Sequence, residues 1–146
     1  MKIIKALIIV SIIFVTANGC EDFSAFTPEI HSVKVTSQEV NGDGATVAIQ
    51  IDAKAENIAI WWGDAAADYQ LYQELIAQPD TGKNYTSTYP QAETFNDNKS
   101  WDGITELEHT YQALGTYSLV IIASSNGNFS EENLQAKYEM ELNVNP

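Results

Sequence analysis

Residues 46–53 read TVAIQIDA, and this stretch decides the fold that we expect for the chain. Its apolar residues Val47, Ile49 and Ile51 occupy every second position, with polar or small residues between them. Because successive side chains of a strand point to opposite faces, this period is typical of a strand with one buried face. We therefore predict a half-buried β-strand here, with these three side chains in the core.

Four other stretches of the chain have strand character, namely residues 30–35, 58–62, 116–124 and 134–144. Asn41-Gly42-Asp43-Gly44 precedes the TVAIQIDA strand and predicts a tight turn, because glycine tolerates positive φ at little cost. No internal repeat is evident. Several strands separated by turns predict an all-β fold, an antiparallel β-sandwich that forms one domain over residues 30–146.

The stretch 65–103 interrupts this pattern, and we interpret it as an insertion between two strands. Residues 68–77 within it predict a short helix with Asp68 as its N-cap. Its apolar residues recur four positions apart, Leu71 with Leu75 and Tyr72 with Ile76.

The charge of the chain excludes one class of function. The sequence has 146 residues, with 20 Asp and Glu against 7 Lys and no Arg, and a formal net charge of -13. Proteins that bind a phosphate backbone use clusters of Lys and Arg, so an acidic chain of this kind is not expected to bind nucleic acid.

The N-terminus has the composition of an export signal. Lys2 and Lys5 precede an apolar run that ends at Val15, too short for a membrane-spanning helix of about 20 residues. The run leads to Thr16-Ala-Asn-Gly-Cys20, which contains the only cysteine of the chain. An ordinary buried thiol is the alternative, although a single cysteine in an exported chain can form no internal disulfide.

The segment ending at Cys20 resembles the lipobox of bacterial lipoproteins, in which the cysteine is acylated and becomes the first mature residue. This resemblance implies a signal peptide over residues 1–19 and a lipid-anchored linker over residues 20–29. Glu21 and Asp22 follow directly and are similar to the surface-export signal of Bacteroidetes lipoproteins. We therefore expect an outer-membrane lipoprotein, at the cell surface or on the periplasmic face.

Two further motifs stand near the predicted strands. Trp62-Gly63-Asp64 ends one strand, and His109-Thr-Tyr111 followed by Gly115-Thr-Tyr117 leads into another. Together they resemble the PKD (polycystic kidney disease) domain, an immunoglobulin-like sandwich, over about residues 30–145. The chain departs from that family at Ala65, where the common pattern has glycine, and in the insertion. We expect these residues to stabilise the fold, because glycine permits tight turns and tyrosine combines a large ring with a hydroxyl.

An apolar patch is expected on an outer face of the sheet. If Trp62 faces the core, Trp61 must face outward, and Val120 and Ile122 turn outward by the same argument. An exposed apolar patch usually marks an interface. We favour the alternative that the insertion covers the patch with the helix residues Leu71, Tyr72, Leu75 and Ile76.

The other aromatic residues of the insertion suit a carbohydrate ligand. Tyr85, Tyr89, Phe95 and Trp101 lie among Thr, Asn, Gln and Asp side chains. Rings can stack on sugar C–H faces while amides and carboxylates bind the hydroxyls. The same rings could equally pack under an edge of the sandwich. The candidate ligand-binding residues are Trp101, Tyr85, Tyr89 and Trp61.

We expect no catalytic activity, no cofactor and no metal site from this sequence. It lacks a G-x-S-x-G or H-E-x-x-H motif, and its two histidines, His31 and His109, lie far apart along the chain. The aspartates 64, 68, 97 and 102 do not follow a recognised calcium-ligand order. The sequence therefore favours a non-catalytic binding module for glycan or for a protein of a polysaccharide-uptake assembly. The alternative is a structural spacer or adhesion domain without a small-molecule site.

Overall fold

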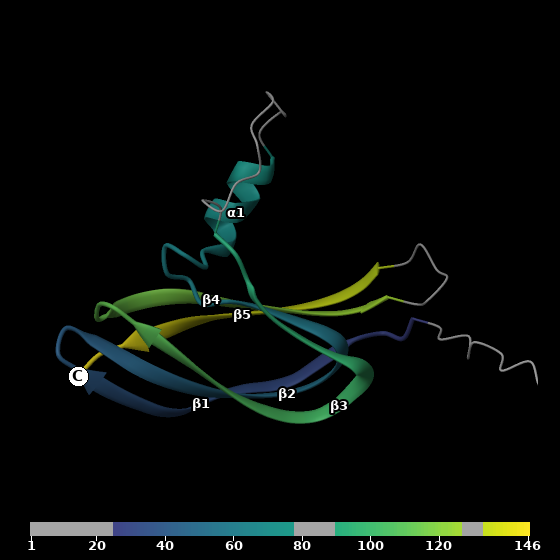
Figure 1. Cartoon of the computed structure of the whole chain (residues 1–146), viewed down its shortest axis with the longest axis horizontal. Helices are drawn as coiled ribbons and strands as arrows, with labels where there is room; N and C mark the ends of the chain where they lie inside the picture. Colours follow the sequence, from purple (N-terminus) through teal and green to yellow (C-terminus); the bar gives the residue numbers. More distant parts are fainter. Residues whose placement is uncertain (1–24, 78–89, 127–132) are drawn as a thin grey trace, which may run out of the picture.

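The computed structural model describes residues 25–77, 90–126 and 133–146, and the side chains of residues 96–101 lie outside that description. The chain is mostly antiparallel β-sheet with one short helix, which confirms the all-β prediction (Figure 1). The elements are β1 (Glu29–Asn41), β2 (Gly44–Trp61), α1 (Tyr69–Ile76), β3 (Glu93–Tyr111), β4 (Gly115–Asn126) and β5 (Asn133–Val144).

The long strand β2 connects all parts of the sheet. It spans both of the strands predicted at residues 46–53 and 58–62, which are therefore one continuous element. β3 pairs with β2 along most of its length, from Ala45 to Ile60. On its other edge, β2 pairs first with β1 up to Lys54 and then with β4 from Asn57 onward. The hydrogen-bonded order is therefore β1-β2-β4-β5, with β3 attached to β2.

A register shift in β2 between Ala55 and Asn57 keeps one face of the strand buried. Before the shift the β2 residues of the core cluster have odd numbers, from Ala45 to Ala55, and after it they have even numbers, beginning with Ile58. In the pairing with β3, Glu56 stands alone opposite the four residues 97–100, and this irregularity reverses which alternate side chains of β2 face the core. Ile58 and Ile60 thus continue the buried row that ends at Ala55, with 1% and 0% of their surface exposed.

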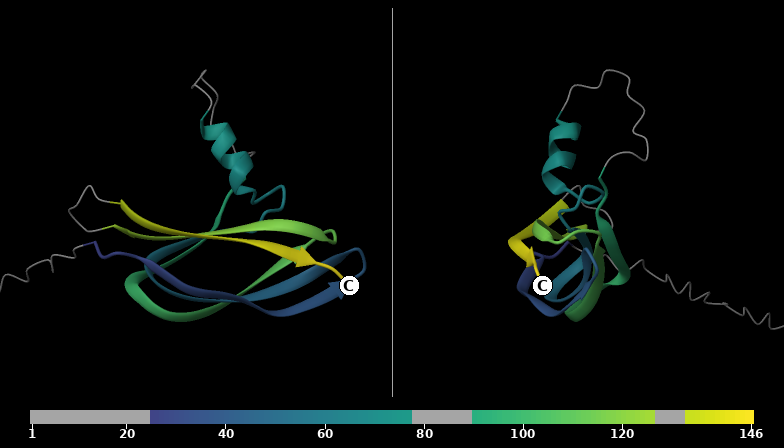
Figure 2. Two further views of the ribbon diagram at one scale, coloured as in Figure 1. Left: turned by 180° about the vertical axis from the view of Figure 1, so that it is seen from behind. Right: turned by 90° about the vertical axis from the view of Figure 1, so that its left-hand side faces the viewer.

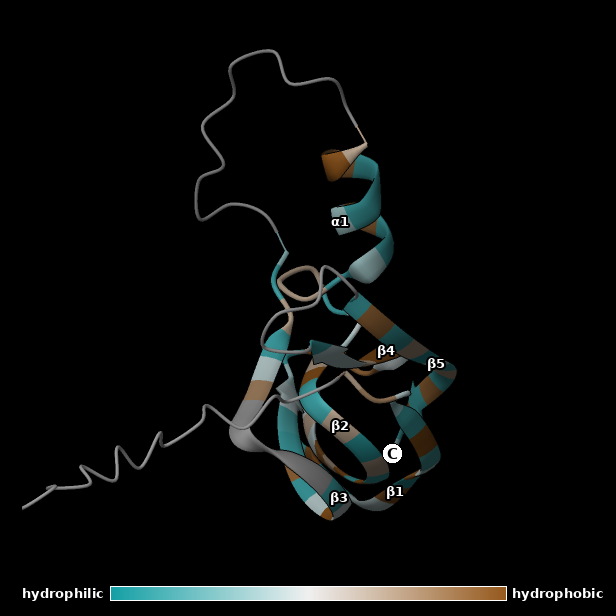
Figure 3. Cartoon of the chain, turned by 90° about the vertical axis from the view of Figure 1, so that its right-hand side faces the viewer, coloured by the Kyte–Doolittle hydropathy of each residue, from teal (hydrophilic) through white to brown (hydrophobic). Residues whose placement is uncertain are grey.

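The core lies between the β4–β5 pair and the β1–β2–β3 part of the sheet, which Figure 1 shows on opposite sides of the molecule. Hydrophobic and hydrophilic residues alternate along the strands (Figure 3). The predicted burial of Val47, Ile49 and Ile51 is confirmed, since each is 0% exposed. The core also contains Leu119, Ile121, Leu142 and Val144, which lie on the predicted inward faces of the last two strands.

Strand β3 differs from the prediction. The stretch interpreted as an insertion extends to residue 103, but β3 already begins at Glu93 and runs to Tyr111. Its residues from Asp102 to Thr110 alternate between exposed and half-buried, and none of them is fully buried. A strand with so little apolar burial lacks the sequence signal by which the other strands were found.

The predicted helix is confirmed as α1, and its N-cap is Asp68 as expected. The Asp68 carboxylate Oδ1 accepts a hydrogen bond from the Leu71 N–H at 2.9 Å. Such a cap binds one of the N–H groups that the first helical turn leaves without an intrahelical partner. The helix stands away from the sheet, and none of its residues is fully buried (Figure 2).

The turn between β1 and β2 confirms the prediction for residues 41–44, and its two glycines have different roles. Gly42 has φ 68, a left-handed conformation that costs other residues roughly 1–2 kcal/mol. No other atom lies near the place where a side chain on Gly42 would begin. A Cβ on Gly44 would lie 2.2 Å from the carbonyl oxygen of Tyr111, so here the absent side chain permits close approach of two strands.

We expect Gly44→Ala to destabilise the fold more than Gly42→Ala. Gly42→Ala should lower the free energy of unfolding by about 1 kcal/mol through its unfavourable φ. Gly44→Ala should cost about 3 kcal/mol, because the β2–β3 pairing must move to relieve the contact. Urea unfolding of both variants measures the difference, and equal losses, or a larger loss for Gly42→Ala, would contradict this account of the turn.

Candidate functional site

An aromatic group joins the base of α1 to the outer face of the sheet. The Trp61 ring centroid lies 5.6 Å from that of Tyr69 and 4.7 Å from that of Tyr72. These contacts leave Trp61 only 6% exposed. The neighbouring Val120, which pairs with Trp61 across the β2–β4 ladder, is 2% exposed. We call Trp61, Tyr69 and Tyr72 the Trp61 group.

The predicted cover of this patch is therefore correct in part. Tyr72 contacts Trp61 as expected, but Leu71 and Ile76 are 40% and 42% exposed. Tyr69 covers Trp61 in addition, and the prediction did not include it. A signal for Tyr69 was present in the sequence, because it lies three residues before Tyr72 and so shares its side of a helix.

A lysine from β5 completes the surroundings of the Trp61 group. The Lys137 ammonium lies 4.4 Å from the centroid of the Tyr69 ring, in a cation–π arrangement. Lys137 also forms an ion pair with Glu139. The hydrogen bond between the two side chains raises the pKa of the Lys137 ammonium. Nothing in the sequence predicted these contacts, because they depend on how β5 is placed beside β4.

The residues of the Trp-Gly-Asp motif form a tight turn at the end of β2. Gly63 has φ 84, and a Cβ at this position would lie 2.6 Å from the Ser118 carbonyl oxygen. The Gly63 N–H donates to the Ala67 carbonyl at 2.9 Å. In the other direction, the Ala67 N–H donates to the Asp64 carboxylate Oδ1 at 3.0 Å. Gly63 and Asp64 thus define the path of the chain from β2 toward α1.

The second motif meets this turn through His109. Its Nε2 donates to the other carboxylate oxygen of Asp64, Oδ2, at 2.8 Å. The imidazole ring stacks on Trp62, with centroids 4.7 Å apart and an interplanar angle of 9°. Asp64 therefore uses one oxygen for the backbone of its own turn and the other for a side chain of β3.

Tyr111 extends the cluster into the core. It is 0% exposed, and its hydroxyl donates to the Trp62 carbonyl oxygen at 2.8 Å. Burial, followed by the charge of Asp64 and the nearby Tyr117, raises the pKa of the Tyr111 phenol above its usual range. The Tyr111 and Tyr117 rings pack with centroids 4.1 Å apart.

The seven motif residues are thus brought together, directly or through a shared neighbour. They are Trp62, Gly63, Asp64, His109, Tyr111, Gly115 and Tyr117. The Tyr117 hydroxyl donates to the Ala113 carbonyl at 2.6 Å, across the turn that contains Gly115. Sequence reasoning missed one partner of the cluster, since Glu93 accepts a 2.8 Å hydrogen bond from the Trp62 indole N–H. Glu93 lies in the part of β3 that falls within the predicted insertion.

The described carboxylates among those considered for calcium have separate roles or lie on separate elements. Asp64 binds His109 and its own turn, and Asp68 caps α1. Asp102 lies on β3, and the side chain of Asp97 lies outside the described residues. Within the described parts of the chain, no three His, Cys, Asp or Glu side chains form a group that could hold a metal ion.

Of the four candidate ligand-binding residues, Trp61 is the one whose side chain the structure describes. Tyr85 and Tyr89 lie outside the described residues, as do Cys20 and the whole proposed signal peptide. The backbone of Trp101 lies on β3 opposite Ala55, but its side chain is not described. The Trp61 ring has little exposed surface, because the Tyr69 and Tyr72 rings pack against it.

No family model, no curated protein and no solved structure matches this chain. In the part of the chain that the structure describes, no helix is long and apolar enough to cross a membrane.

We expect Tyr111→Phe to weaken the fold in a pH-dependent way. At pH 8 the variant should lose about 1–2 kcal/mol, because the Trp62 carbonyl loses its buried donor. Above pH 10 the unfolded phenol ionises while the folded Tyr111 keeps its proton, so the wild-type protein loses stability as the pH rises. The phenylalanine variant escapes this loss.

The difference between the two proteins should therefore shrink by about 1 kcal/mol between pH 8 and pH 11. Urea unfolding of both proteins at the two pH values measures it. Lysine and the other tyrosines titrate in both proteins and cancel in the comparison. A difference that stays constant or grows would show that the Tyr111 proton is not held by the fold.

Proposed function

We propose that this protein is a lipid-anchored, non-catalytic binding module of the bacterial outer membrane. In this proposal an acyl group on Cys20 holds the chain at the membrane, and the β-sheet body contacts a glycan or a protein of a polysaccharide-uptake assembly. The observation that carries the proposal is the hydrogen bond that joins the linker to the β-sheet body. The Phe26 N–H donates to the hydroxyl of Ser125, a residue that is 0% exposed.

The fastened linker leaves a short tether. Pro28 is buried, and the Lys54 ammonium lies 5.2 Å from the centroid of the Phe26 ring. The body therefore begins at about Phe26, six positions after Cys20. Since an extended chain spans at most about 3.6 Å per residue, an anchored body would stay within roughly 20 Å of the lipid surface. Such a position suits a protein that works by contact at a membrane.

The lipid would have to supply the attachment by itself. The chain carries a formal net charge of -13, so an anionic membrane would not attract it. Acyl chains contribute about 0.8 kcal/mol for each buried methylene, which is enough for stable anchoring when two or more chains are present.

We also propose that the body is an immunoglobulin-like sandwich of the PKD type. The convergence of the Trp-Gly-Asp and His-Thr-Tyr motifs supports this assignment. Asp64 binds His109, and the Tyr111 hydroxyl binds the Trp62 carbonyl, so residues far apart in sequence act as one structural unit.

The same cluster favours contact over catalysis. His109 lies 2.8 Å from the Asp64 carboxylate, whereas His31 lies 3.8 Å from that of Glu29, and the Asp64 carboxylate is bound to its own turn through its other oxygen. A general base needs a partner arrangement that leaves it able to reach substrate. Here the imidazole is stacked on Trp62 and directed at a structural turn. A spacer without a ligand remains the second candidate.

We expect Cys20→Ala to abolish membrane attachment. Without the thiol no acyl group can be added, so the protein should move from the detergent phase to the aqueous phase in a detergent partition. Ser24→Ala, close by in the linker, should leave the partition unchanged. Mass spectrometry of the wild-type N-terminus provides the direct measurement, and an unmodified thiol at Cys20 would refute the anchor.

We expect the intact protein to bind a polysaccharide through Trp101. Trp101→Ala should weaken retention on immobilised polysaccharides about five- to thirtyfold, because stacking of one ring contributes roughly 1–2 kcal/mol. Trp101→Phe, which keeps a ring, should retain most of the binding. If no polysaccharide on a broad glycan array binds, while a membrane protein co-purifies with the chain, the ligand is a protein. If neither is found, the spacer function is favoured.

A further inference from the structure

Strand β3 has one edge without a partner strand in the described structure. It pairs with β2 alone, in unbroken register from Asp102 to Tyr111. The opposite side of the sheet is less open, because β5 contacts β1 and the Gln38 side chain donates to the Asn145 carbonyl. An unpaired edge presents N–H and C=O groups that can bind a further strand.

The outward row of β3 carries a regular pattern. Every second residue is exposed to solvent, and the intervening ones point toward the core side. Ile104 is 60% exposed, more than any other large apolar residue of the described chain. The exposed row consists of Asp102, Ile104, Glu106, Glu108 and Thr110.

Among the described residues, the acids of this row have no lysine partner. The ion pairs among the described residues are His31–Glu29, His109–Asp64 and Lys137–Glu139, and none includes Asp102, Glu106 or Glu108.

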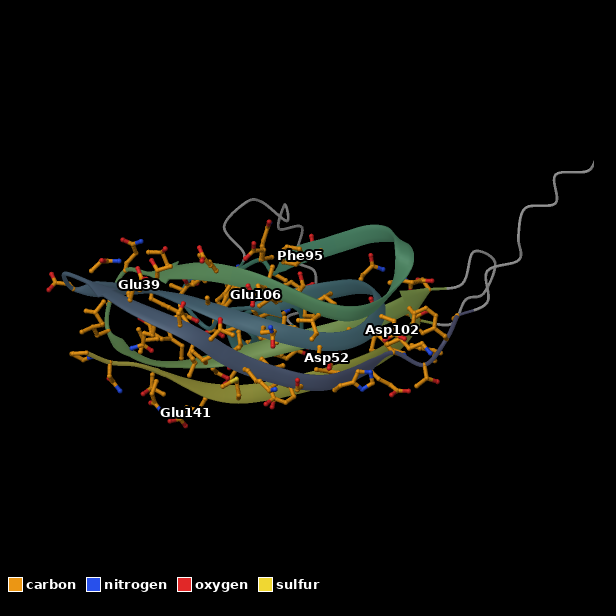
Figure 4. All side chains as sticks on the ribbon, turned by 90° about the horizontal axis from the view of Figure 1, so that it is seen from below. Glu39, Asp52, Phe95, Asp102, Glu106 and Glu141 are labelled. Atoms are coloured by element: carbon orange, nitrogen blue, oxygen red, sulfur yellow. The ribbon has the colours of Figure 1, made fainter. Side chains whose placement is uncertain are left out.

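On β2, the residues opposite these acids do not neutralise them either. Gln50 lies opposite Glu106 and donates to its carboxylate Oε1 at 3.2 Å, and Ala48 lies opposite Glu108. Lys54 lies opposite Asp102, but its ammonium is over the Phe26 ring. Figure 4, which views the molecule from below Figure 1, labels Asp52, Asp102 and Glu106.

We propose that the free edge of β3 binds an extended basic segment of a partner protein by strand addition. The backbone of the segment would pair with β3 between Asp102 and Thr110. Its lysine or arginine side chains, at alternate positions, would face Asp102, Glu106 and Glu108, and an apolar side chain would face Ile104. This inference rests on the proposed contact function and names the class of protein partner.

The pattern argues against a second copy as the occupant. Antiparallel pairing of two β3 strands would place acidic rows side by side, and like charges on neighbouring strands destabilise the pair. With a basic segment, the electrostatic interaction between side chains on the neighbouring strands becomes attractive. Residues 102–111 contain no proline, no lysine and no register shift, so of the devices that usually protect an edge strand only charged side chains, here acidic ones, are present.

A synthetic peptide tests the proposal. The probe has nine residues, with Thr, Lys, Lys, Val and Lys at its odd positions and Thr at the even ones. Paired antiparallel to β3, it places its lysines opposite the three acids and its valine opposite Ile104. We expect the full-length protein in detergent to bind it, and hydrogen exchange of backbone amides between residues 102 and 110 to slow on binding.

Two sets of controls separate strand addition from loose charge attraction. Glu106→Gln with Glu108→Gln should weaken the peptide about fivefold, whereas Glu141→Gln on β5 should leave affinity unchanged. Because successive N–H groups of a strand point to opposite edges, N-methylation of the odd or of the even residues should abolish binding in one case only. Binding that survives both methylations, or that leaves the β3 amides unprotected, would overturn the proposal.

The result is independent of the anchor and the glycan. The peptide measurement needs no acylated Cys20 and no Trp101. An unmodified Cys20 with intact peptide binding would refute the proposed anchoring alone. Absence of peptide binding to the acylated protein would refute the strand addition alone.

Discussion

The register shift of β2 at Glu56 is the constraint on which the rest of the structure depends. If the side chains of β2 alternated without interruption through Glu56, Ile58, Ile60 and Trp62 would point to the side opposite Val47 and Ile51, and no single core could form. The shift coincides with the change of neighbour on β2, from β1 to β4. The Glu56 carboxylate also accepts a hydrogen bond from the Asn126 N–H at the end of β4. The irregularity at Glu56 thus lets β2 serve both parts of the sheet.

The motif cluster secures the other end of β2. The chain leaves the sheet at Trp62 and returns only at β3. The two ends of this connecting segment must therefore be held together by contacts between residues distant in sequence. Trp62 provides three of them: its indole N–H binds Glu93, its ring stacks on His109, and its carbonyl accepts from Tyr111. These partners all belong to β3. A strand with few buried apolar residues is therefore held in register by polar and aromatic contacts at its two ends.

This difference explains how much could be predicted from the sequence. Val47, Ile49 and Ile51 predict their strand correctly because one face of that strand is fully buried. Asp68 predicts the start of the helix because capping is an interaction between residues close in sequence. The register shift at Glu56 and the edge strand β3 could not be predicted from neighbouring residues, since both depend on pairing with residues distant in sequence. The same holds for the Trp61 group. Tyr72 could be found from helical spacing, whereas Lys137 reaches Tyr69 only because β5 is paired with β4.

The two outer faces of the sheet have opposite character, and β2 again determines this. After the shift, its outward residue Trp61 joins Val120 in an apolar surface, which needs the cover that Tyr69 and Tyr72 of α1 supply. Before the shift, its outward residues include Gln50 and Asp52, which lie beside the acidic row of β3 and need no cover. A polar surface stays open to solvent at no cost, while an apolar one favours burial. The helix therefore stands where the strand order makes the sheet apolar, and the charged face is left available for contact.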